Sequence, residues 1–284
     1  MTFHTVISAA TLIAFPQPIV IVDCRHDLAD TDAGRRAYAG GHIPGAYFLH
    51  LDDDLSGIKI AGDGSFRGRH PLPEAADFIR TLQRLGINHE TQVIAYDAHG
   101  GMFAARLWWM LRWVGHAAVA VLDGGLPAWV AAGGALSTAP AAKVEGQITL
   151  RPSLVGTVTA DQLVANLTAP TMQILDARAA DRYRGENETL DRVGGHIPGA
   201  INRFFKGNLQ ATGHFKSAEN LRTEFNEVIT DASTTVMQCG SGVTACHHLL
   251  AMEIAGLPGA WLYPGSWSEW SSDPKRPIVL GDAP

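Results

Sequence analysis

Cysteine is scarce in this sequence, and basic residues do not outnumber acidic ones. The three cysteines, Cys24, Cys239 and Cys246, are too few and too unevenly spaced for a disulfide framework. We therefore expect a reducing compartment, the cytoplasm by default, in which a thiol can serve chemistry. Lys and Arg number 22 against 28 Asp and Glu, which gives a formal charge of -6 and no basic stripe. Nucleic acid is not expected as a partner.

Long apolar runs are also missing. None approaches the roughly 18 residues that a membrane span needs, so no membrane partner is expected. The apolar stretch at residues 5–15 has no positively charged segment before it, and we interpret it as the first helix of a soluble protein. With 284 residues, 46% of them hydrophobic, the chain can build two domains of ordinary size.

The sequence does contain a long internal repeat. The heptapeptide GGHIPGA stands at residues 40–46 and again at 194–200. Each copy follows a β-branched run that ends in Asp and Arg, and further matches follow downstream, where 93–97 resembles 236–239 and 122–129 resembles 262–270. The two copies are 154 residues apart, and a period of this length indicates a duplicated domain rather than a solenoid.

Both halves alternate short β-branched runs with helical patterns, which are found at residues 73–85, 101–114, 218–229 and 243–255. This alternation predicts the α/β class, with two tandem domains that are each a parallel sheet flanked by helices. Residues 137–158 are rich in Ala, Pro, Ser, Thr and Gly and read as a linker. The predicted domains are 1–140 and 155–284, with a boundary near residue 150.

A cysteine follows the strand that is expected at residues 234–238. The loop reads Cys239-Gly240-Ser241-Gly242-Val243-Thr244 and leads into an apolar helix. Gly240 and Gly242 can adopt backbone angles closed to other residues, so the N–H groups of the loop can turn inward around the sulfur. Together with the positive end of the helix they would stabilise negative charge on Cys239. The alternative is a buried structural cysteine on a tight turn.

Two other chemistries fit the loop less well. A cysteine phosphatase or arsenate reductase needs an arginine at the sixth position after the nucleophile, and Ala245 stands there. Cys246, His247 and His248 are adjacent on a helix and point in different directions, so no metal site is expected. The first-half counterpart of Cys239 is Asp97, which cannot carry sulfur. Only the second domain is therefore expected to be catalytic.

The paired GHIPGA segments and the single CGSGVTA loop resemble the rhodanese and mercaptopyruvate sulfurtransferase family over nearly the whole chain. The resemblance implies that Cys239 takes sulfur from 3-mercaptopyruvate as a persulfide, releases pyruvate, and passes the sulfur to cyanide or a thiol acceptor such as thioredoxin. No cofactor is implied. Thiosulfate is the alternative donor, although the uncharged loop is of the mercaptopyruvate type. A non-catalytic, sulfur-sensing module is a further alternative.

The resemblance also implies roles for individual residues. Asp52, His70 and Ser241 match a proton relay, although Asp52 could be a solvated loop acid and His70 a turn residue. A carboxylate clamp would use Arg182 and a second arginine nine residues later, where this chain has Asp191 followed by Arg192. We therefore take Arg192 as the second candidate. The remaining expected contacts with the donor come from the loop itself: Gly240, Gly242, Val243 and Thr244.

Overall fold

The computed structural model describes residues 2–16 and 18–283, which form two compact units. Unit 1 contains residues up to Gly57, Pro73–Leu154 and Leu209–Phe215, and unit 2 contains Ile58–Leu72, Val155–Asn208 and the chain from Lys216 onward. Each unit thus includes one short segment from the other half of the sequence. The predicted boundaries at 1–140 and 155–284 stay a prediction.

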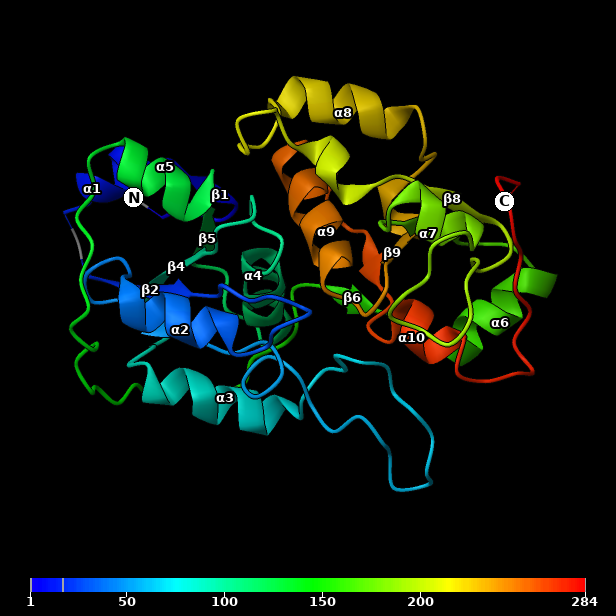
Figure 1. The fold of residues 1–284 in the computed structure, drawn as a ribbon, viewed down its shortest axis with the longest axis horizontal. Helices are drawn as coiled ribbons and strands as arrows, with labels where there is room; N and C mark the ends of the chain where they lie inside the picture. Colours follow the sequence, from blue (N-terminus) through cyan, green and yellow to red (C-terminus); the bar gives the residue numbers. More distant parts are fainter. Residues whose placement is uncertain (1, 17, 284) are drawn as a thin grey trace. The chain divides into compact units, whose positions relative to one another are not determined.

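Unit 1 is built on a parallel five-stranded sheet in the order β1-β5-β4-β2-β3. Its strands are β1 (Val6–Ile7), β2 (Ile19–Asp23), β3 (Tyr47–Phe48), β4 (Gln92–Tyr96) and β5 (Val119–Leu122). Its helices are α1 (Ala9–Ile13), α2 (Ala33–Gly40), α3 (Ala75–Arg84), α4 (Ala104–Trp113) and α5 (Gly125–Ala131). Figure 1 shows α1 and α5 on one side of the strands and α3 on the other.

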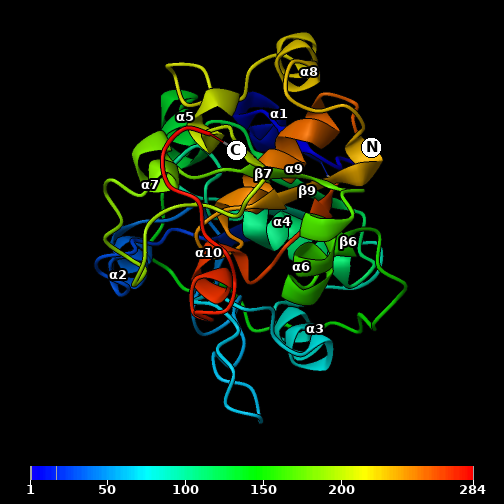
Figure 2. The same ribbon diagram turned by 90° about the vertical axis from the view of Figure 1, so that its right-hand side faces the viewer.

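Unit 2 repeats this topology with the order β6-β10-β9-β7-β8, again all parallel. Its strands are β6 (Gly156–Thr157), β7 (Gln173–Asp176), β8 (Ala200–Asn202), β9 (Thr235–Gln238) and β10 (Trp261–Leu262). Its helices are α6 (Ala160–Thr168), α7 (Ala180–Arg184), α8 (Ala218–Asn226), α9 (Thr244–Ile254) and α10 (Ser266–Trp270), with 3₁₀ turns η1 (Phe205–Asn208) and η2 (Ala232–Thr234). Figure 2 shows α9 alongside β9. The expected fold class is confirmed.

The central strands β4 and β9 are buried along their whole length. Helices cover both faces of each sheet, so these strands read as near-continuous apolar runs without the alternation of a half-exposed strand. No helix within the described part of the chain is both long enough and apolar enough to cross a bilayer.

The duplication extends to individual side-chain contacts. Arg25 donates through Nε and Nη2 to Asp23, and Arg178 makes the same pair of bonds to Asp176. The histidine of each GHIPGA segment stacks on a tyrosine, with ring centroids 3.8 Å apart for Tyr38 and His42, and 3.7 Å apart for Tyr183 and His196. These buried contacts explain both histidines as parts of the fold.

Candidate active site

Cys239 lies at the carboxyl end of β9, where the chain turns into α9. Its side chain is buried, with only 2% of the residue exposed. Ligand sites of open parallel sheets lie at this end of the strands. Val243 is the N-cap of α9 and Thr244 its first residue, so the main-chain N–H groups of the helix start lie just beyond the cysteine.

The segment at residues 266–268 forms hydrogen bonds with the main chain of this loop. The N–H groups of Trp267 and Ser268 donate to the carbonyl oxygens of Cys239 and Gly240, both at 2.9 Å. Ser266 accepts the N–H of Cys239 on its Oγ at 3.1 Å. Ser266 has φ 53°, a left-handed conformation that is uncommon outside glycine. The segment at residues 266–268 therefore anchors the cysteine loop.

The two loop glycines serve different purposes. Gly242 has φ 76°, and an added Cβ would lie 2.3 Å from the carbonyl oxygen of Pro264. The expected special backbone angle is thus present at Gly242, but it is wrong for Gly240, which is absent from the positive-φ glycines. A Cβ at Gly240 would instead crowd Nη2 of Arg69 at 2.8 Å, so this guanidinium would have to shift.

Unit 1 shows what such a loop does with negative charge. Asp97 follows β4 as Cys239 follows β9, and its carboxylate is fully buried. It accepts four main-chain N–H groups, from His99, Gly101, Phe103 and Ala104, at 2.8–3.0 Å. The loop of unit 1 is therefore an anion cradle that is filled by its own side chain.

Arg69 and Arg182 lie beside the cysteine loop. A Cβ on Gly240 would be 2.8 Å from Nη2 of Arg69 and 3.5 Å from both terminal nitrogens of Arg182. Arg182 matches the sequence-based expectation for a clamp residue. Arg69 does not, because it is 170 residues before Cys239 and belongs to a segment that the repeat does not mark. The only sequence signal was its position next to His70.

Two carboxylates neutralise these arginines. Glu188 accepts a hydrogen bond from Nη2 of Arg182 at 2.8 Å, and Asp191 forms an ion pair with Nη1 of Arg69. Burial alone would raise the pKa of Glu188, but hydrogen bonds from Arg182 and from main-chain N–H groups lower it. Burial raises the pKa of Asp191, and its ion pair with Arg69 opposes that rise. Arg192 is exposed.

Arg178 is a third cation near the sulfur. It is buried, and its guanidinium lies 4.6 Å from the ring centroid of Trp267. Burial works against its charge, yet Asp176, Glu188 and negative charge on Cys239 together raise the pKa of Arg178 above its usual range. A thiolate or persulfide anion at Cys239 therefore interacts favourably with Arg178.

His70 and Ser241 are brought together as the sequence comparison suggested. His70 Nδ1 lies 2.8 Å from Ser241 Oγ, and both residues are buried. The contact lies within unit 2, because His70 belongs to the Ile58–Leu72 segment. A hydrogen-bonded His and Ser beside a buried cysteine can move a proton at that site.

Asp52, the third residue of the expected relay, belongs to unit 1. Its Oδ2 lies 3.9 Å from Nε2 of His26, a buried histidine whose pKa is lowered by burial. Although His26, His50 and Asp52 could approach one metal ion, His50 places Nε2 2.8 Å from Thr31 O and accepts the N–H of Asp52 on Nδ1 at 3.2 Å. Both nitrogens of His50 are engaged, so this group does not fit a metal.

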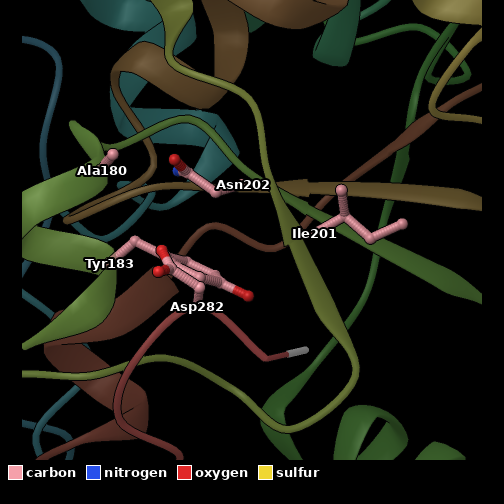
Figure 3. A pocket seen from close by; sticks show the side chains of 5 residues that line it. All are labelled: Ala180, Tyr183, Ile201, Asn202 and Asp282. Atoms are coloured by element: carbon pink, nitrogen blue, oxygen red, sulfur yellow. The ribbon is translucent and has the colours of Figure 1, made fainter.

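Helix α7 presents different side chains to the cysteine loop and to a cavity. Ala180 and Tyr183 line a cavity of about 320 Å³ together with Ile201, Asn202 and Asp282 (Figure 3). Burial raises the pKa of Tyr183 to about 12, so its hydroxyl stays protonated and donates to Ala200 O at 2.6 Å. This bond helps to fix the helix that carries Arg182.

The fold and the site define a duplicated α/β protein in which the loop after the central strand carries a buried cysteine in one copy and a buried aspartate in the other. The family model described as the rhodanese-like domain matches residues 8–132 and 159–273, and the chain belongs to this family.

Relatives of the chain include a Pseudomonas aeruginosa protein named probable 3-mercaptopyruvate sulfurtransferase, which is 44% identical over 93% of each chain. Thiosulfate sulfurtransferase of Gallus gallus is 35% identical over 83% of this chain and 80% of its own. The crystal structure of SseA from Escherichia coli, described as a 3-mercaptopyruvate sulfotransferase, superposes with a TM-score of 0.79 at 31% identity, covering 94% of this chain and 100% of that one.

Proposed function

We propose that this protein is a sulfurtransferase that moves sulfur from 3-mercaptopyruvate, through a persulfide on Cys239, to a thiol acceptor or cyanide. The observation that carries the proposal is the uncharged Gly240-Ser241-Gly242 loop with two arginines beside it. Such a loop suits a monoanionic donor whose carboxylate is bound next to the loop, and a planar guanidinium matches a carboxylate with two parallel hydrogen bonds.

Arg69 and Arg182 bind the donor carboxylate in this proposal, and Arg69 takes the role that was expected of Arg192. The support is that both guanidinium groups lie next to Gly240, since an added Cβ there would be 2.8 Å from Nη2 of Arg69 and 3.5 Å from the terminal nitrogens of Arg182. The main-chain N–H groups from Gly240 to Thr244 would hold negative charge on the sulfur, as their counterparts in unit 1 hold the carboxylate of Asp97.

The first half-reaction is balanced without any oxidant. The Cys239 thiolate attacks the donor sulfur, an S–S bond forms and the C–S bond breaks, and its electron pair passes to the enolate of pyruvate. The proton of the donor thiol ends on the methyl carbon of pyruvate. Ser241 and His70 are the proposed carriers of this proton, with Asp52 as the proposed acid of the relay.

In the second half-reaction an acceptor removes the outer sulfur and leaves the Cys239 thiolate. The acceptor is a thiol such as that of thioredoxin, or cyanide, and no cofactor takes part. A reducing compartment such as the cytoplasm suits this chemistry, and none of the three buried cysteines is in a disulfide. The two predicted domains, 1–140 and 155–284, would be a supporting and a catalytic copy.

Intact mass spectrometry after incubation with 3-mercaptopyruvate tests the proposal. We expect a gain of one sulfur atom that cyanide removes, together with release of one pyruvate. Cys239→Ser should show neither, whereas Cys246→Ser, a matched change at a buried cysteine of α9, should behave as wild type. Sulfur gain in Cys239→Ser would refute the assignment.

Thiosulfate is a second candidate donor, favoured by the name of the chicken relative. The ratio of kcat/KM for the two donors at one cyanide concentration decides between them. A non-catalytic module would release no pyruvate with either donor.

A further inference from the structure

Unit 2 carries an insertion that unit 1 lacks. Tyr38 and His42 are 4 positions apart, whereas the equivalent Tyr183 and His196 are 13 apart. Both carboxylates that neutralise the arginines of the site, Glu188 and Asp191, lie in this longer connection. Acidic charge at the cysteine loop is thus specific to the copy that bears the cysteine.

Asp191 occupies a position between the two arginines. Its Oδ1 accepts from Arg69, and its Oδ2 is 3.6 Å from Nη2 of Arg182. The same Oδ2 is buried and has no hydrogen-bond partner among the described residues. Glu188 is different, because both of its carboxylate oxygens accept from Arg182 and its Oε2 also lies 3.6 Å from Nη1 of Arg178. It therefore holds these two arginines in place.

The charges of this group cancel. Arg69 and Arg182 contribute two positive charges, and Glu188 and Asp191 contribute two negative ones. Arg178 and Asp176 cancel each other in the same way. A donor therefore meets a group without net charge. Loss of one of its negative charges would leave a net positive charge, which attracts a dianion about twice as strongly as a monoanion because the Coulomb energy is proportional to the charge of the ligand.

We propose that Asp191 determines donor specificity: its carboxylate, held between Arg69 and Arg182, disfavours dianionic thiosulfate and leaves the site selective for a monoanionic 2-oxo acid. The inference rests on the proposed sulfur transfer and adds the residue that sets its substrate class. It concerns charge, so an isosteric neutral side chain is the appropriate probe.

The decisive variant is Asp191→Asn, because the amide oxygen can still accept from Arg69 while the negative charge is lost. At an effective dielectric constant of about 20 and a separation on the order of 8 Å, with some ionic screening, we expect the kcat/KM ratio of thiosulfate to 3-mercaptopyruvate to rise about tenfold. The value for thiosulfate should rise in absolute terms, and the change should shrink in high salt.

Two further variants separate charge from structure. Asp191→Glu keeps the charge and should retain the wild-type ratio. Asp181→Asn removes a charge from a half-buried residue of α7 that hydrogen-bonds to Asn187, and it should also leave the ratio unchanged. If Asp191 had only a structural role, Asp191→Asn would lower kcat/KM for both donors without changing their ratio.

The outcomes are distinguishable from a failure of the proposed function. If wild type forms no persulfide with either donor, the proposed function fails. The specificity role of Asp191 is refuted if wild type is active and Asp191→Asn keeps the wild-type ratio of kcat/KM values. An equal loss of kcat/KM for both donors in this variant would refute it as well.

Discussion

Gly240→Ala offers a sharp test of the site, because the structure gives a spatial reason for glycine there and no conformational one. The new Cβ would lie 2.8 Å from Nη2 of Arg69 and 3.5 Å from Arg182. Both neighbours are the ends of flexible side chains, so they can move aside at little cost to folding. The guanidinium groups would then no longer converge on the position that we assign to the donor carboxylate.

Gly240→Ala should affect donor binding strongly and stability only slightly. A hydrogen bond to a charged group contributes roughly 1.5–3 kcal/mol, so displacing Arg69 should lower kcat/KM for 3-mercaptopyruvate by about tenfold to a hundredfold. Stability should change little, since alanine at an ordinary φ restricts the unfolded chain and can add about 0.5 kcal/mol. The variant should therefore be folded, fully able to form a thiolate, and poor in donor binding.

Steady-state kinetics with 3-mercaptopyruvate and thermal unfolding together check this expectation. Gly207→Ala is the matched control, because a Cβ at Gly207 meets nothing within 4 Å. We expect KM to rise in Gly240→Ala alone, with unfolding midpoints close to wild type in both variants. An unchanged KM in a folded Gly240→Ala would refute the placement of the carboxylate beside Arg69 and Arg182.

Four other changes have defined outcomes. Gly242→Ala should lose several kcal/mol of stability by urea unfolding, because φ is 76° and its Cβ would lie 2.3 Å from a carbonyl oxygen. Ser241→Ala should lower kcat about tenfold or more with KM nearly constant; an unchanged kcat would remove it from the relay. Asp97→Ala leaves four main-chain N–H donors, three of them in buried bonds, without their acceptor and should cost about 3 kcal/mol, measured in urea. Burial holds the pKa of His248 well below its ordinary value of 6.5, so the unfolded state binds a proton that the folded state does not. Stability should therefore fall as pH drops below about 6.5. His248→Gln should flatten this pH dependence, and an unchanged pH dependence would contradict the prediction.

Much of the fold could be predicted from local patterns. The helical pattern at 218–229 became α8 (Ala218–Asn226), and the β-branched run at 19–25 contains β2 (Ile19–Asp23). Paired GHIPGA segments identified the duplication because both copies keep the same histidine, which stacks on a tyrosine in each unit. The cysteine loop was visible because glycines, a strand and a helix are contiguous in the sequence.

Arg182 was expected from the sequence, but Arg69 could not be assigned in this way. Arg69 reaches the loop from a segment 170 residues away, and no local pattern encodes such an approach. Arg192 was chosen by counting from Arg182, but the chain presents Asp191 to the site and Arg192 to solvent. Gly240 was expected to need a special backbone angle, but its φ is not positive, and a Cβ there would instead displace the neighbouring guanidinium groups.

The membership of Ile58–Leu72 in unit 2 has a consequence for how the gene can be divided. Arg69 and His70 are encoded in the first copy of the duplication, yet they contact the loop encoded in the second. Expression of the second copy by itself would give a protein that contains Cys239 but lacks Arg69 and His70. Recombination that exchanged one copy between homologues would likewise have to preserve both, which ties the inheritance of the two halves together.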